Sequence, residues 1–115
     1  MITVQFKRDI KSKILIGYNV DGHAEYQDGD TMVYDDLVCG VVSNLAQVTI
    51  IGVTEVLGID ASYVAEEGDI RLDISELSIE AISSCQVLLE TMLLGLQRLE
   101  ITYSEYIKVF IEEVR

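Results

Sequence analysis

The 115-residue sequence has no proline and no tryptophan, a single histidine and only two cysteines. The cysteines, Cys39 and Cys85, lie far apart, which argues against a disulfide framework and for a reducing compartment. Residues 1–8 lack the basic-then-apolar layout of a signal peptide. No apolar run reaches the roughly 18 residues that span a bilayer. We therefore expect a cytoplasmic protein with no membrane partner.

Positive charge is scarce as well. Eight Lys and Arg residues stand against 20 Asp and Glu residues, which gives a formal net charge of −12. No basic stripe is available to hold phosphates, so we expect no direct binding to nucleic acid. The acidic surface either only keeps the protein soluble or raises the rate of encounter with basic partners. Composition leaves both interpretations open.

Motifs for cofactor and metal chemistry are missing. Gly17 and Gly22 match neither fingerprint of a nucleotide-binding glycine loop. One histidine and two cysteines lack the spacing of metal ligands, and the acidic residues are abundant without clustering. We expect neither a cofactor nor a metal ion.

What is present is an ordered series of strand and helix patterns in one domain, residues 1–115, long enough to bury a single core. Apolar and polar residues alternate through the first twenty positions, which predicts an antiparallel hairpin. Residues 21–35 form a polar, glycine-punctuated segment without periodicity, which predicts a loop. A second hairpin is predicted from residues 61–65 and 70–74.

Helical spacing of apolar residues begins at Leu37. Asp35 or Asp36 can cap the start of this first helix, and Gly58 can end it. Its content of β-branched residues is high, so the prediction depends on length and caps rather than on propensity.

A second helix is predicted from about Ser78 to Glu100. Its apolar face is wide enough to bury two sides, and the spare surface predicts a homodimer. The residues that follow, 103–114, fit a helix and a strand equally well. Periodicity alone does not decide between them.

His23 and Cys39 are the residues that could perform chemistry together. His23 sits in a polar loop just after a strand, where scaffolds often carry catalytic groups. Cys39 falls in the first turn of the first predicted helix, where unpaired N–H groups and the helix dipole stabilise a thiolate. A thiolate beside a protonated imidazole is a competent nucleophile for acyl transfer.

Neighbouring groups could assist this pair. Asp36 could orient the imidazole or simply cap the helix, and the N–H groups of Cys39 and Gly40 could hold a developing oxyanion. The alternative is structural: a free cysteine is usually a small buried hydrophobe, and a lone loop histidine is usually just exposed. Cys85, on the apolar stripe of the second helix, is expected to fill the core.

One segment of the sequence reads Gly22-His23-Ala24, and a later one reads Asp36-Leu37-Val38-Cys39 with Ser43 four residues further on. In this arrangement the chain resembles the ribosomal-processing cysteine protease family. That family has a Gly-His-Ala segment, a short flexible loop and an Asp-(Ile/Leu)-Val-Cys segment followed by a serine. The resemblance continues through residues 88–97 and 103–109, so it spans nearly the whole chain.

The resemblance implies a cysteine endopeptidase with Cys39 and His23 as its catalytic dyad. Members of the family remove the N-terminal extension of ribosomal protein L-twenty-seven, whose basic region is the implied partner and suits an acidic enzyme. It also implies a homodimer with a two-layer α+β fold: a mostly antiparallel sheet, two long helices, and a strand as the closing segment. The implied supporting positions are Gly22, Asp36, Gly40 and Ser43.

The chain departs from the family pattern at two places. The loop between His23 and Cys39 is a few residues longer, with residues 30–35 as the expected extra length, and Gly40-Val41 replaces a pair of small residues. Both departures bear on the substrate more than on the reaction. The rival functions are a non-catalytic ribosome-associated interaction module of the same fold and a thiol-based redox sensor.

Overall fold

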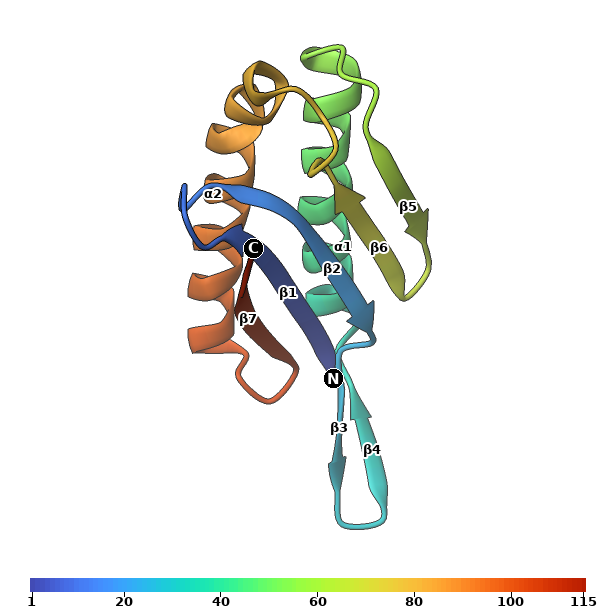
Figure 1. Ribbon diagram of the computed structural model, residues 1–115. Helices are drawn as coiled ribbons and strands as arrows, with labels where there is room; N and C mark the ends of the chain where they lie inside the picture. Colours follow the sequence, from blue (N-terminus) through green and yellow to red (C-terminus); the bar gives the residue numbers. More distant parts are fainter.

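A computed structural model describes all residues, 1–115, and contains seven strands and two long helices (Figure 1). The strands are β1 Ile2–Asp9, β2 Leu15–Gly22, β3 Glu25–Asp28, β4 Thr31–Tyr34, β5 Ser62–Glu66, β6 Asp69–Asp73 and β7 Ile107–Val114. The helical segments are α1 Asp36–Ile51, its π-helical continuation η1 Gly52–Val56, and α2 Ile79–Thr102.

Five strands form the main sheet in the order β5-β6-β2-β1-β7. The three pairs among β5, β6, β2 and β1 are antiparallel, and β7 joins β1 in parallel. The hairpin predicted for the first twenty residues is therefore confirmed, as is the second hairpin. The closing segment is a strand, as the resemblance implied. It can run parallel to β1 because the long helix α2 carries the chain back across the sheet.

Both helices cover one face of the sheet, so the molecule has two layers (Figure 1). The alternation in β1 places Ile2, Val4 and Phe6 on the helix-facing side, where they join a core of 23 buried apolar residues. Tyr18 of β2 lies in this core and donates its hydroxyl to the carbonyl of Ala46 at 2.7 Å. This hydrogen bond fixes α1 against the strand that leads to His23. The predicted α+β fold is confirmed.

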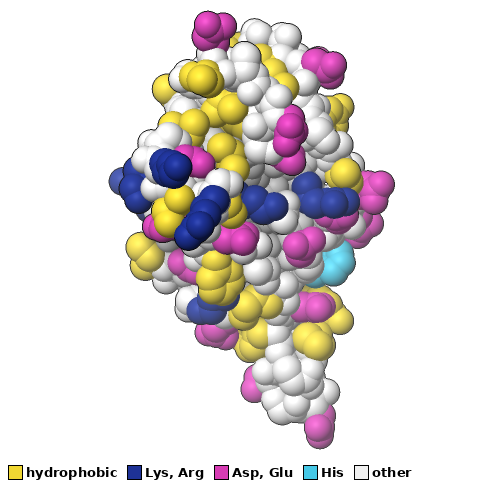
Figure 2. Space-filling view, viewed as in Figure 1, with side chains coloured by type: hydrophobic (Ala, Val, Ile, Leu, Met, Phe, Trp, Pro, Cys, Tyr) yellow, Lys and Arg dark blue, Asp and Glu magenta, His cyan; other side chains and the backbone are white.

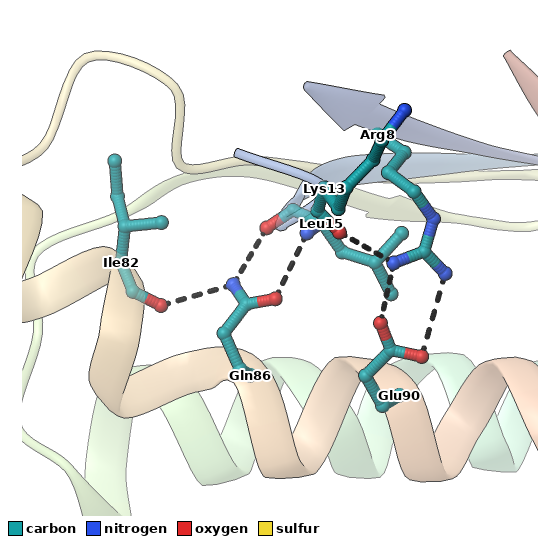
Figure 3. Close-up of polar contacts among 6 residues, drawn as sticks. All are labelled: Arg8, Lys13, Leu15, Ile82, Gln86 and Glu90. Carbon is teal, nitrogen blue, oxygen red and sulfur yellow. Dashed lines mark hydrogen bonds and ion pairs between the residues drawn. The ribbon is translucent and has the colours of Figure 1, made fainter. Parts of the chain in front are cut away.

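Polar contacts fix α2 to the turn between β1 and β2 (Figure 3). The Gln86 side chain accepts from the N–H of Leu15 and donates to its carbonyl, both at 2.8 Å. Arg8 forms an ion pair with Glu90 at 2.7 Å. The amide pair satisfies backbone groups at the start of β2, where the chain leaves the β1–β2 turn.

Helix α1 begins where the sequence predicts, and Asp35 is the residue that caps it. Its Oδ1 accepts the N–H of Val38 at 3.0 Å, whereas Asp36 is exposed in the first turn. The helix continues into the π-helical turn η1 and stops before Gly58, which has φ +67°. The π-helical turn has no counterpart in the predicted pattern.

Residues 21–35 do not form the loop that was predicted. β3 and β4 pair in an antiparallel hairpin around Gly29-Asp30, and it projects away from the two layers (Figure 1). Gly29 has φ +62°, as a two-residue type II′ turn requires at its first position. The rings of Tyr26 and Tyr106 pack in an edge-to-face arrangement with their centroids 5.2 Å apart. This contact joins the base of the hairpin to the α2–β7 connection.

A hydropathy average over longer windows gives a different result from the count of uninterrupted apolar residues. The segments Asp36–Val56 and Ile79–Thr102 are each long and apolar enough to cross a membrane by length and composition, with mean hydropathies of 1.8 and 1.4. In the structure one face of each helix packs on the sheet and supplies core residues. Core helices meet the same criterion, so the test carries little weight here.

Candidate active site

A cavity of about 450 Å³ opens between the start of α1, the end of β2 and the turn that joins β5 to β6. It brings together every site residue that the sequence and the resemblance named. These residues are Gly22, His23, Asp36, Cys39, Gly40 and Ser43.

Cys39 is half-buried in the first turn of α1. Its Sγ accepts a hydrogen bond from the N–H of Ala24 at 3.1 Å. The carbonyl of Ala24 in turn accepts the N–H of Asp35 at 2.9 Å. Ala24 therefore links the end of β2 to the start of the helix and orients the thiol beside a polar donor.

Because the N–H of Cys39 donates to the carbonyl of Asp35 at 3.1 Å, it is engaged in the first turn of the helix. The expectation that this N–H would hold an oxyanion is therefore not met in this structure. Gly40 faces open space, since no atom lies within 4 Å of a Cβ placed on it. Ser43, one turn further along, is half-buried in the cavity wall.

His23 is exposed at the rim of the cavity, directly before the buried Ala24. The residue before it, Gly22, fixes the direction of the backbone at His23. Gly22 has φ +92°, and a Cβ on Gly22 would overlap the carbonyl oxygen of Met1. No hydrogen bond joins His23 to Cys39 in this structure, although both side chains line the same cavity. Catalytic hydrogen bonds are often long before substrate is bound.

The turn between β5 and β6 is the part of the site that the sequence did not reveal. Glu66, Glu67, Gly68 and Asp69 line the same cavity as Cys39. Glu66 and Glu67 together with Asp36 make its lining acidic, whereas Asp69 is paired with Arg71 at 2.9 Å. No Lys or Arg lines it, and Figure 2 shows the histidine at the surface among acidic side chains. The hairpin pattern of the sequence predicted that this turn exists, but not that it belongs to the site. Its position beside the end of β2 follows from the order of the strands in the sheet.

Cys85 differs from Cys39. It is fully buried on the core face of α2, and burial raises the pKa of its thiol. Its predicted role as a core residue is confirmed. No group of three or more His, Cys, Asp and Glu side chains is arranged to hold a metal ion.

The family model described as cysteine protease Prp matches residues 1–108. The chain belongs to the Prp family. This confirms the resemblance, and it makes the protein a cysteine protease. A comparison with curated proteins gave no match.

Solved structures share the fold. A Streptococcus mutans protein, SMU.848, superimposes with a TM-score of 0.75 at 24% identity, over 99% of each chain. The S. aureus ribosomal processing protease Prp gives TM-scores of 0.61 with a covalently linked product peptide and 0.62 with a substrate peptide. Their identities to this chain are 22% and 23%, over 97% of this chain and 100% of theirs. At these identities the superpositions establish the fold.

Proposed function

We propose that this Prp-family protease is an endopeptidase that removes the N-terminal extension of a ribosomal protein precursor. Cys39 is its nucleophile and His23 its general base. The observation that carries the proposal is that one cavity holds both residues, although they come from different elements and lie sixteen positions apart. The family assignment favours this activity over the interaction module and the redox sensor.

The reaction follows from the placement of the two side chains. His23 accepts the thiol proton as Sγ of Cys39 attacks the scissile carbonyl, and it returns that proton to the departing amine. Water then attacks the thioester, releases the acid product and restores the thiol. Asp36, on the rim of the same cavity, is suited to orient the imidazole because Asp35 already caps the helix.

A basic peptide is the substrate class that the cavity favours. Asp36, Glu66 and Glu67 line it with no Lys or Arg among the lining residues, in a chain with a net charge of −12. Asp69 also lines it, but its carboxylate is paired with Arg71 at 2.9 Å. Such a rim attracts Lys and Arg side chains and repels acidic ones. These charges support the basic N-terminal region of the precursor of ribosomal protein L-twenty-seven as the substrate. The S. aureus relative is itself a ribosomal processing protease crystallised with peptides.

A second copy of the chain is the partner that α2 favours. Its outward side carries apolar side chains at intervals of seven or eight residues, all more than half exposed: Ile79, Val87, Leu94 and Ile101. An apolar stripe of this length is suited to pair with its own copy about a twofold axis. We also place the protein in the cytoplasm, because Cys39 and Cys85 are both free thiols, the state that a reducing compartment maintains.

The test is to mix the purified protein with the ribosomal protein L-twenty-seven precursor of its own host and follow the products by mass spectrometry. We expect one cut at the extension junction by wild type and by Cys85→Ala, and none by Cys39→Ala. Binding of the precursor without cleavage would instead favour the interaction module. Absence of both binding and cleavage would direct the search to another substrate.

A further inference from the structure

The imidazole of His23 lies against the turn that joins β5 to β6. Glu66 and Asp69 pair across this turn, so Glu67-Gly68 are its two central residues. A Cβ built on Gly68 would lie 3.3 Å from Nε2 and 3.4 Å from Cε1 of His23. A side chain at position 68 would therefore press against the edge of the ring.

Gly68 also holds the backbone that precedes the histidine. Its carbonyl accepts the N–H of Gly22 at 3.1 Å, which joins the turn to the end of β2. Gly68 has φ +76°, the left-handed conformation needed at the third position of a type II turn. Gly68 thus faces the ring of His23 through the direction of its absent Cβ, and it holds the residue before His23 by a hydrogen bond.

We propose that Gly68 is a positioning residue for His23. This inference relies on the proposed function, in which His23 is the general base. Gly68 lines the same cavity as His23 and Cys39, and the absence of a Cβ on it lets the imidazole lie against the turn without a tight contact. The β5–β6 turn thereby supports the base, while Ala24 orients the thiol.

A methyl group at this position forces a local adjustment. The contact is tighter than ordinary van der Waals distance, and the atoms it meets belong to an exposed side chain that can rotate. The imidazole is therefore displaced more easily than the backbone of the turn. A displacement of a few tenths of an ångström at a catalytic base lowers the rate of the proton-transfer step and leaves substrate binding nearly unchanged.

Gly58→Ala is the matched control for Gly68→Ala. Gly58 has φ +67°, so alanine meets similar backbone strain there, but no atom lies within 4 Å of a Cβ at Gly58. Gly68→Asn serves as a second variant, because asparagine tolerates the left-handed conformation and still carries the Cβ. It keeps the test informative if Gly68→Ala folds poorly.

The experiment follows the surroundings of the His23 ring and its catalysis by separate measurements. His23 is the only histidine in the chain, so its Cε1–H proton gives a single imidazole signal in NMR spectra. We expect Gly68→Ala and Gly68→Asn to shift that signal and to lower kcat on the precursor peptide about tenfold, with KM within twofold of wild type. Gly58→Ala should change neither.

Two results would overturn the proposal. One is a His23 signal and a kcat in the Gly68 variants that equal those of wild type. The other is an equal loss in Gly58→Ala, which would assign the effect to backbone strain. If wild type fails to cleave the peptide, the proposed function fails, and the NMR signal still decides whether Gly68 positions the ring.

Discussion

The backbone N–H of Ala24 donates to Sγ of Cys39 at 3.1 Å, and Ala24 directly follows His23. The same short segment therefore carries the imidazole and orients the thiol. Because Ala24 is almost fully buried and its carbonyl holds the N–H of Asp35, the segment is anchored on both sides. The relative position of His23 and Cys39 thus depends on two hydrogen bonds of Ala24, one donated to Sγ of Cys39 and one accepted from the N–H of Asp35, the cap of α1.

The start of α1 depends on one of two neighbouring aspartates. Replacing Asp35 by alanine removes the acceptor for the N–H of Val38 and should lower the free energy of unfolding by about 1 kcal/mol. Asp36→Ala is the control, because Asp36 is exposed and makes no such bond, and the change should stay within about 0.5 kcal/mol. Urea unfolding measures both. Equal losses would contradict the assignment of Asp35 as the cap.

The close approach of Leu88 in α2 is expected to make alanine unfavourable at Gly52. A Cβ on Gly52 would lie 2.8 Å from Cδ1 of Leu88, so Gly52→Ala should lower the free energy of unfolding by about 1 kcal/mol or more. Gly95→Ala is the matched change in α2. No atom lies within 4 Å of a Cβ there, so alanine should raise the free energy of unfolding by roughly 0.5–1 kcal/mol. Thermal or urea unfolding should give opposite signs.

Much of this architecture could be predicted from the sequence. Alternation in β1 and β2 and helical spacing from Leu37 mark elements whose one face is buried, and such patterns follow directly from burial. The β3–β4 hairpin was missed because most of its side chains are exposed, so no alternation was imposed on it. The signal that could have revealed it is the Gly29-Asp30 pair, a typical two-residue hairpin turn.

The site was only partly predictable for a different reason. His23 and Cys39 lie in segments with recognisable residues, whereas the β5–β6 turn reaches the cavity through the strand order of the sheet. Strand order is a long-range property that the spacing of apolar residues does not encode. The hydrogen bond from Ala24 was missed because a backbone donor leaves no trace in side-chain identity.

The acidic rim should govern the encounter with a basic substrate. Glu67→Gln is expected to lower kcat/KM for the precursor peptide roughly two- to fivefold at low salt, which corresponds to the 0.5–1 kcal/mol of an exposed charge pair. Glu55→Gln, which removes a charge outside the cavity, is the control. Raising the ionic strength should abolish the difference between Glu67→Gln and wild type. A loss that persists in high salt would indicate a structural effect of Glu67.

The exposed stripe of α2 predicts the oligomeric state. Val87→Glu places a charge in the middle of the stripe and should convert the proposed dimer into a monomer. Burying an unpaired carboxylate in the interface would cost more free energy than the apolar contacts supply. Thr3→Glu, at an exposed position of β1 on the sheet face that points away from the helices, should leave the dimer intact. Light scattering after size-exclusion chromatography gives the mass of each. A monomeric wild type, or a dimer that survives Val87→Glu, would contradict the proposed interface.

The proposed dyad is tested most directly by the rate at which iodoacetamide alkylates each cysteine near neutral pH, read by peptide mass spectrometry. In wild type, Cys39 should react at least ten times faster than the buried Cys85. His23→Ala should slow Cys39 about tenfold or more and leave Cys85 unchanged, because the imidazole accepts the thiol proton. Equal rates for Cys39 in wild type and His23→Ala would contradict the assignment of His23 as its base.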